Sequence, residues 1–93
     1  MMEDNQDFPD WVRQIQRSDE PEIDKLREFF GRVTCQIVEY AEREIELARA
    51  MQDRDEMVKQ QIKRETIKTA RALFARGYQI ATGRRAWDEQ DNR

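Results

Sequence analysis

Residues 22–83 decide the fold, and they read EIDKLREFFGRVTCQIVEYAEREIELARAMQDRDEMVKQQIKRETIKTARALFARGYQIATG. The stretch has no proline, and its apolar residues recur at the spacings of three and four that are typical of a helix face. We therefore predict an all-α fold, a long antiparallel helical hairpin with a tight turn near Asp53. Its helices should cover about residues 21–52 and 55–82, after a short helix at about residues 9–17.

Three sequences of the form Asp-x-x-acid mark the predicted helix starts, at residues 7–10, 19–22 and 53–56. An Asp at the N-cap accepts a hydrogen bond from a free backbone N–H, and a further acid favours the positive end of the helix dipole. Proline strengthens the first two starts because its missing N–H is unpaired in the first turn anyway. The third start decides whether the chain turns. Nothing from Arg49 to Lys59 is a strong breaker, so one continuous rod is the alternative.

Each long helix has an apolar stripe that we expect to be buried against the other helix. The first stripe is Ile23, Leu26, Phe30, Val33, Ile37, Ala41, Ile45, Ala48 and Met51, and the second is Val58, Ile62, Thr66, Ala70, Leu73, Gly77 and Ile80. A bend near residue 54 would pair residues whose numbers add to about 108. The pairs predicted by this register are Glu39–Lys68, Glu44–Arg64, Val33–Phe74 and Gly31–Gly77.

The charge distribution also favours a hairpin. Residues 1–53 contain 7 Lys+Arg and 14 Asp+Glu, a net charge of −7, whereas residues 54–93 contain 10 and 6, a net charge of +4. The sum is the −3 of the whole chain. An acidic half followed by a basic half suits two helices that pair with each other.

The composition excludes several kinds of active site. There is no histidine, which removes the usual general base and the usual nitrogen ligand for zinc or haem. The only cysteine, Cys35, is expected to be a small buried hydrophobe. A cluster of carboxylates on the second helix is expected to be a solvated acidic face and no metal site: Glu39, Glu42, Glu44 and Glu46. We predict no enzyme, no catalytic residue, no cofactor and no small-molecule substrate.

The two termini and the hydropathy of the chain indicate its domain organisation. We expect a disordered N-terminus at residues 1–8, a single helical domain at residues 9–85 and a polar tail at residues 86–93, in which Trp87 should pack somewhere. The N-terminus lacks the features of a signal peptide, and no apolar run approaches the roughly 20 residues of a membrane span. A single cysteine is typical of a reducing compartment. These features predict a soluble cytoplasmic protein without membrane contact.

The helices are more apolar than a two-helix hairpin requires. Phe8, Trp11, Val12 and Ile15 share one side of the first helix, which we expect to dock on the hairpin. The surplus on the long helices predicts a protein partner, with a homodimer that completes a coiled-coil-like four-helix bundle as the first expectation. The residues expected to serve protein interaction are Phe8, Trp11, Ile15, Phe29, Phe30, Val38, Tyr40, Phe74, Tyr78 and Trp87.

These features predict a non-enzymatic helical interaction module, an adaptor, assembly factor or small regulator that self-associates or docks on a larger protein. The alternative is a nucleic-acid-associated regulator that uses a basic face of the third helix. The residues for that alternative are Lys59, Lys63, Arg64, Lys68 and Arg71. The acidic net charge disfavours the alternative, because phosphate binding depends mainly on Lys and Arg.

Overall fold

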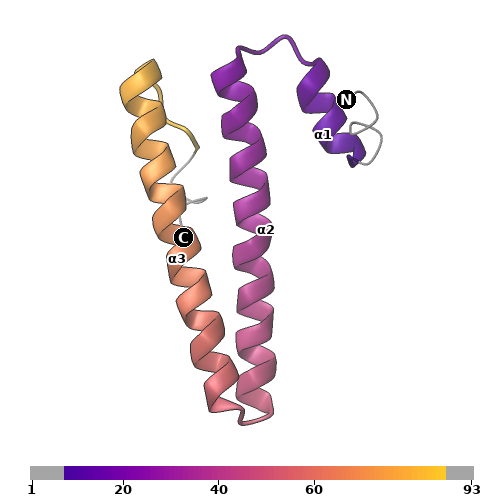
Figure 1. The fold of residues 1–93 in the computed structure, drawn as a ribbon, viewed down its shortest axis with the longest axis vertical. Coiled ribbons are helices and arrows are strands. Elements are labelled where there is room, and N and C mark those ends of the chain that lie inside the picture. The colour runs from indigo at the N-terminus through magenta and orange to yellow at the C-terminus, as the bar shows by residue number, and fades with distance from the viewer. Residues whose placement is uncertain (1–7, 88–93) are drawn as a thin grey trace.

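The computed structural model describes residues 8–87, and these residues form a helical hairpin with a short helix beside it. Helix α1 is Asp10–Arg17, α2 is Glu22–Ala50 and α3 is Arg54–Thr82. The two long helices run antiparallel side by side, and α1 lies against α2 on the side away from α3 (Figure 1). The hairpin is confirmed and the continuous rod is excluded. Each helix begins and ends within two residues of its predicted bounds.

The turn between α2 and α3 is built from local hydrogen bonds. Asp53 is the N-cap of α3, and its Oδ1 accepts a hydrogen bond from the backbone N–H of Glu56 at 3.1 Å. Gln52 has a φ of 59°, in the left-handed region, so the chain reverses within the residues between the two helices. The capping pattern at residues 53–56 is therefore confirmed, and it is what separates the long helical stretch into two arms.

The other two capping predictions are wrong in mechanism. Pro9 and Pro21 are themselves the N-caps of α1 and α2, and neither helix start has a side-chain cap hydrogen bond. Asp19 precedes its helix by too many residues to cap it, and Asp7 lies outside the described residues. Proline marks these starts because its φ near −60° already suits the entry into a helix.

The register of the hairpin differs from the prediction by about one helical turn. Phe30 stacks on Phe74, and the side chain of Arg71 donates to the carbonyl of Gly31. The numbers of such cross-helix pairs add to between 102 and 105, because the bend is centred on Gln52 and not on residue 54. Phe74 stacks on Phe30, where the prediction had Val33, and Gly31 accepts from Arg71 and lies beside Trp87, where it had Gly77. Among residues 8–87, the predicted ion pairs Glu39–Lys68 and Glu44–Arg64 are absent.

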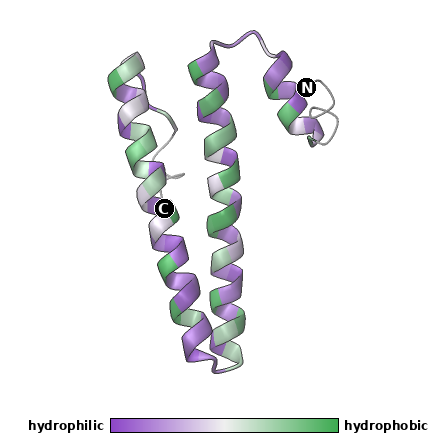
Figure 2. Ribbon diagram, viewed as in Figure 1, coloured by the Kyte–Doolittle hydropathy of each residue, from purple (hydrophilic) through white to green (hydrophobic). Residues whose placement is uncertain are grey.

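The buried stripe of α2 is partly as predicted, with Ala41, Ile45 and Ala48 facing α3. The prediction for α3 is wrong. Val58, Ile62, Leu73 and Ile80 are exposed, and the residues of α3 that are buried are Gln60, Arg71 and Tyr78. Figure 2 shows hydrophobic and hydrophilic positions interspersed along both long helices. Because α3 is apolar on two opposite sides, the spacing of its apolar residues did not determine which side would pack.

Helix α1 docks on the hairpin, as predicted. Trp11 stacks on Phe29 with ring centroids 5.8 Å apart, and the guanidinium of Arg32 lies 4.7 Å from the Trp11 ring. Lys25 donates to the carbonyl of Gln16 at 2.8 Å, which ties the end of α1 to the start of α2. A helix of 8 residues is marginal alone in water, so these contacts are what hold it.

The segment after α3 folds back onto the hairpin. Gly83 has a φ of 76°, and its N–H donates to the carbonyl of Gln79, so α3 ends on the left-handed glycine that is typical of helix C-termini. Ala86 is buried, and Trp87 stacks on Phe74 with ring centroids 5.8 Å apart. The folded unit thus extends past the predicted boundary at residue 85. Of the predicted disordered N-terminus, residues 1–7 lie outside the described residues, as does the remainder of the polar tail, residues 88–93.

Candidate interaction surface

The side of α3 turned away from α2 carries an exposed aliphatic stripe, which we call the outer stripe. It consists of Val58, Ile62, Leu73 and Ile80, together with the small residues Thr66, Thr69 and Gly77 between them. The exposed fractions of the four aliphatic side chains are 44%, 63%, 69% and 78% in chain order. Large aliphatic side chains with this much exposure in one line form a surface patch and not the rim of a core.

The outer stripe runs straight along α3. Val58, Thr69 and Ile80 are spaced by 11 residues, as are Ile62 and Leu73, and Thr66 and Gly77. Eleven residues span three turns at 3.67 residues per turn, close to the natural period of an α-helix, so residues at this spacing stay in line. A 29-residue helix is about 43 Å long, and the stripe occupies most of this length.

The packed face of α3 combines the aromatic residues Phe74 and Tyr78 with buried polar side chains. Arg71 is 5% exposed, and its Nη1 donates to the Gly31 carbonyl and to Thr34 Oγ1, both at 2.7 Å. Gln60 is also buried, and its Nε2 donates to Glu56 at 2.8 Å. A helix that buries Arg71 and Gln60 while it exposes four aliphatic side chains has the reverse of the pattern expected for an isolated hairpin.

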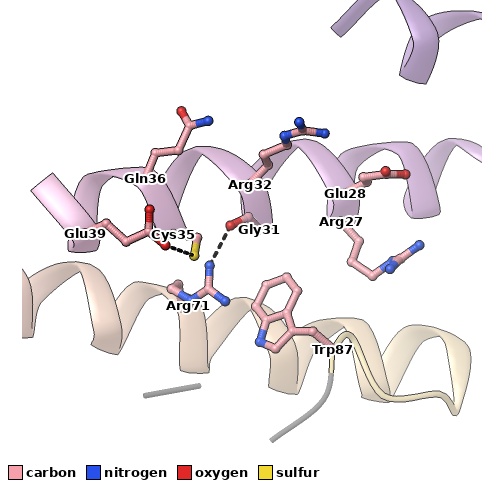
Figure 3. A pocket seen from close by; sticks show the side chains of 9 residues that line it. All are labelled: Arg27, Glu28, Gly31, Arg32, Cys35, Gln36, Glu39, Arg71 and Trp87. Atoms are coloured by element: carbon pink, nitrogen blue, oxygen red, sulfur yellow. Dashed lines mark hydrogen bonds between the residues drawn. The ribbon is translucent and has the colours of Figure 1, made fainter. Parts of the chain in front are cut away.

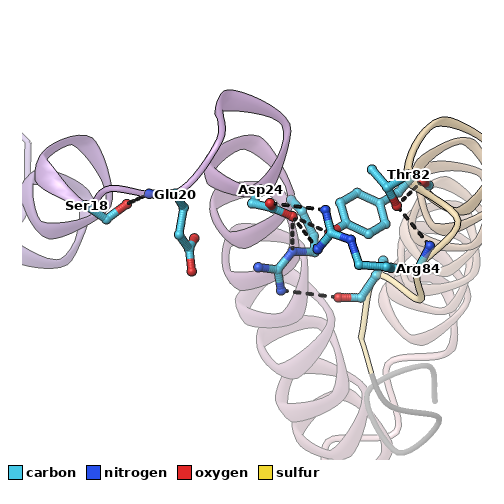
Figure 4. Close-up of polar contacts among 8 residues, drawn as sticks. Ser18, Glu20, Asp24, Thr82 and Arg84 are labelled. Atoms are coloured by element: carbon cyan, nitrogen blue, oxygen red, sulfur yellow. Dashed lines mark hydrogen bonds and ion pairs between the residues drawn. The ribbon is translucent and has the colours of Figure 1, made fainter.

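A polar cluster holds the open end of the hairpin together. The hydroxyl of Tyr78 on α3 donates to Asp24 on α2, and both terminal nitrogens of Arg84 lie 3.3 Å from the two Asp24 oxygens (Figure 4). The hydrogen bonds from Tyr78 and then Arg84 lower the pKa of Asp24 below its ordinary value of 3.8. The same bond from Tyr78 raises the pKa of its own phenol above 10.0. The cluster is a structural clamp for the segment after α3.

Trp87 closes one side of an open cavity of about 390 Å³ between α2 and α3 (Figure 3). Arg71 lies 4.6 Å from its ring centroid, and a Cβ built on Gly31 would lie 3.0 Å from a ring carbon. Gly31 is therefore explained by close approach of Trp87, and not by Gly77, whose surroundings are open. Cys35, half-buried at the same cavity, contacts Glu39 with its Sγ 3.7 Å from a carboxylate oxygen.

The predicted interaction residues separate into two groups. Ile15 and Tyr78 are buried in the chain, and Phe30, Phe74 and Trp87 form a stack between the two long helices. The second group remains at the surface. Trp11 and Val38 are half-buried, and the exposed members are Phe8, Phe29 and Tyr40. None of the residues in either group belongs to the outer stripe. The face that the hairpin leaves most exposed was assigned by sequence to its interior.

The predicted basic face of α3 does not form one surface. Arg71 is buried, Arg64 pairs with Glu65 at 3.1 Å, and Lys63 lies 5.3 Å from the ring centroid of Tyr40. Lys68 is half-buried on the other flank of α3 from Lys59.

The carboxylates of α2 are equally dispersed. Glu46 pairs with Arg49 at 2.6 Å, and Glu39 contacts Cys35. Within residues 8–87, no group of three or more His, Cys, Asp or Glu side chains is placed to hold a metal ion. Over the same residues, no helix is both long enough and apolar enough to cross a bilayer.

Sequence reasoning missed both the clamp and the outer stripe. Asp24 is the only acid on the packed face of α2 that is buried, and an acid at such a position is a signal for a partner on the facing helix. No known protein family, curated protein or solved structure matches this chain.

Proposed function

We propose that the chain is a non-enzymatic helical interaction module, which binds a further helix along the outer stripe of α3. The exposure of Val58, Ile62, Leu73 and Ile80 carries this proposal. Each large apolar side chain left in water forgoes roughly 1.5–3 kcal/mol of burial free energy. A straight aliphatic line along one helix is the surface that a second amphipathic helix recognises.

The bound helix would come from a second copy or from a larger protein on which the chain acts as an adaptor, assembly factor or small regulator. Self-association would bring two hairpins, and so four long helices, into one assembly, joined through α3 and not packed around one shared core as the sequence predicts. The single cysteine, Cys35, supports action in the reducing environment of the cytoplasm. The dispersal of the basic residues gives no support to nucleic-acid binding.

Capture on immobilised chain tests the proposal. Three forms are compared: wild type, the double variant Ile62→Glu/Leu73→Glu, and Leu47→Glu, which changes an exposed leucine of α2 and serves as the control. Each form is immobilised and then incubated with lysate of the native host, to which free tagged wild-type chain has been added. We expect wild type and the control to retain the same protein, whether the tagged chain or another, and the double variant to lose it.

Helix content by circular dichroism must be equal in the three forms, because all the changed residues are exposed. If the three forms retain the same proteins in the same amounts, or retain nothing, the outer stripe is not an interaction surface and the proposal is wrong.

A further inference from the structure

The large and small residues of the outer stripe are ordered so that the stripe fits against a second, antiparallel copy of itself. Ile62 and Leu73 are its largest exposed side chains near the centre, and its small positions are Thr66, Thr69 and Gly77. A Cβ built on Gly77 would have nothing within 4 Å, so this glycine is an open recess in the helix surface. Glycine inside a helix costs up to about 1 kcal/mol against alanine, and no contact within residues 8–87 explains its presence here.

These residues define one antiparallel register. The residue numbers of Ile62 and Gly77 add to 139, and so do those of Thr66 and Leu73. Two copies of α3 running in opposite directions at this register place each large side chain level with a small position of the other copy. Val58 and Ile80, whose numbers add to 138, then meet at the two ends. A two-fold axis passes beside Thr69, as a self-complementary interface requires.

The charges beside the stripe favour the same arrangement. Glu65 and Arg76 both lie on the exposed side of α3, and their numbers add to 141, within one turn of the register. Each glutamate of one copy thus lies near the arginine of the other, twice in the dimer. A parallel pairing offers no such attraction, because each glutamate is then level with the other glutamate and about 16 Å along the helix from the arginine.

We propose that the occupant of the outer stripe is a second copy of this chain, bound antiparallel with Ile62 and Leu73 of each copy over Gly77 and Thr66 of the other. This inference rests on the proposed function and names its partner. Because the outer stripe is on the side of α3 opposite α2, the two α3 helices occupy the middle of the assembly and the two α2 helices its outside.

Charge reversal tests the register. Glu65 and Arg76 are 11 residues apart on one helix, about 16 Å, too far to pair within a chain. The single variants Glu65→Arg and Arg76→Glu should each weaken self-association by about tenfold or more, because each creates like-charged pairs across the dimer. An equimolar mixture of the two variants restores opposite charges at every pair. Sedimentation equilibrium should therefore show dimers in the mixture at concentrations where each variant alone is monomeric.

A disulfide gives a second measurement of the register. In a Cys35→Ser background, Thr69→Cys should form an interchain disulfide under mild oxidation, because the two-fold axis brings that position close to its copy. Val58→Cys should not, since its two copies would be about 34 Å apart along the helices. Crosslinking of both variants, or a mixture that remains monomeric, overturns the antiparallel register.

The outcomes separate this inference from the proposed function. If wild type stays monomeric but retains another protein through the outer stripe, the second copy is the wrong occupant and the interaction module stands. If no association of any kind depends on the outer stripe, both proposals are wrong.

Discussion

Gly31 and Gly77 are both glycines inside long helices, yet their surroundings differ. A Cβ on Gly31 would lie 3.0 and 3.1 Å from two ring carbons of Trp87, whereas a Cβ on Gly77 would meet nothing within 4 Å. Sequence reasoning paired the two glycines because they fell at one level in the predicted register. The structure gives them separate roles, close approach of Trp87 for the first and an open surface for the second.

The two glycines form a matched pair of variants. Gly77→Ala should raise the free energy of unfolding by up to about 1 kcal/mol through helix propensity alone. Gly31→Ala gains the same propensity but forces Trp87 outward, and overpacking typically costs about 1–3 kcal/mol. Thermal melts at low micromolar concentration should therefore rank Gly77→Ala above Gly31→Ala. In a Trp11→Phe background, only Gly31→Ala should shift the fluorescence of Trp87 to longer wavelength. Equal stabilisation by both changes would show that Trp87 does not occupy this place.

The charge of Asp24 makes the clamp dependent on pH. Its pKa is lowered in the folded chain by the hydrogen bonds from Tyr78 and Arg84. A depressed pKa contributes stability above the ordinary value of 3.8, and this contribution is lost as pH falls through the folded value. We expect wild type to melt at a higher temperature than Asp24→Asn near pH 7, and the gap to shrink progressively below about pH 4. A gap that is constant from pH 7 to pH 2 would mean that the Asp24 charge adds nothing.

At the scale of the element, the helix bounds were predictable and the packed faces were not. Bounds depend on local signals, such as Pro9, Pro21, Asp53 and Gly83, which act within a few residues of where they stand. The packed face of α3 depends on Arg71 and Gln60, whose burial is possible only because specific acceptors lie beside them. An apolar pattern cannot select this face, because Phe74 and Tyr78 share it with buried polar residues while the opposite side of α3 is aliphatic.

The register was predicted incorrectly for a related reason. Antiparallel pairing depends on the centre of the bend, and a shift of that centre by two residues moves every pair by about one turn. Gln52 has a left-handed backbone conformation, and it places the centre of the bend at residue 52. A glycine would have indicated such a conformation in the sequence, but this position is a glutamine. The clamp at Asp24 follows from the true register, so sequence reasoning could not place Tyr78 and Arg84 around it.

The cap at Asp53 is the local signal that separates α2 from α3. Asp53→Ala removes the acceptor for the Glu56 N–H and should lower the free energy of unfolding by about 1 kcal/mol. Asp53→Asn retains a side-chain oxygen and is the control, with a loss of only a few tenths of a kcal/mol expected. Urea denaturation followed by circular dichroism measures both changes. If alanine and asparagine have the same effect, the cap is not what stabilises the turn.

On the scale of the whole molecule, the side of α3 that faces α2 is fully packed, whereas the side that carries the outer stripe is exposed. The clamp, the aromatic stack and the buried Arg71 join α2, α3 and the segment after them. The outer stripe has no covering element within residues 8–87. The sequence predicted a surplus of apolar surface, and Phe29 and Tyr40, which it assigned to that surplus, are exposed. It left out the outer stripe, because it expected the aliphatic side of α3 to face α2.

The mass of the chain in solution tests the central claim, that the outer stripe is a binding face that a second copy covers. Sedimentation equilibrium should be run on wild type and on Ile62→Glu/Leu73→Glu from about 1 to 100 µM, a range that spans typical weak and moderate affinities. We predict that the mass of wild type rises from 11.3 kDa towards twice that value, while the double variant stays at 11.3 kDa. A wild-type mass of 11.3 kDa at every concentration, or an equal rise in both proteins, would contradict the claim.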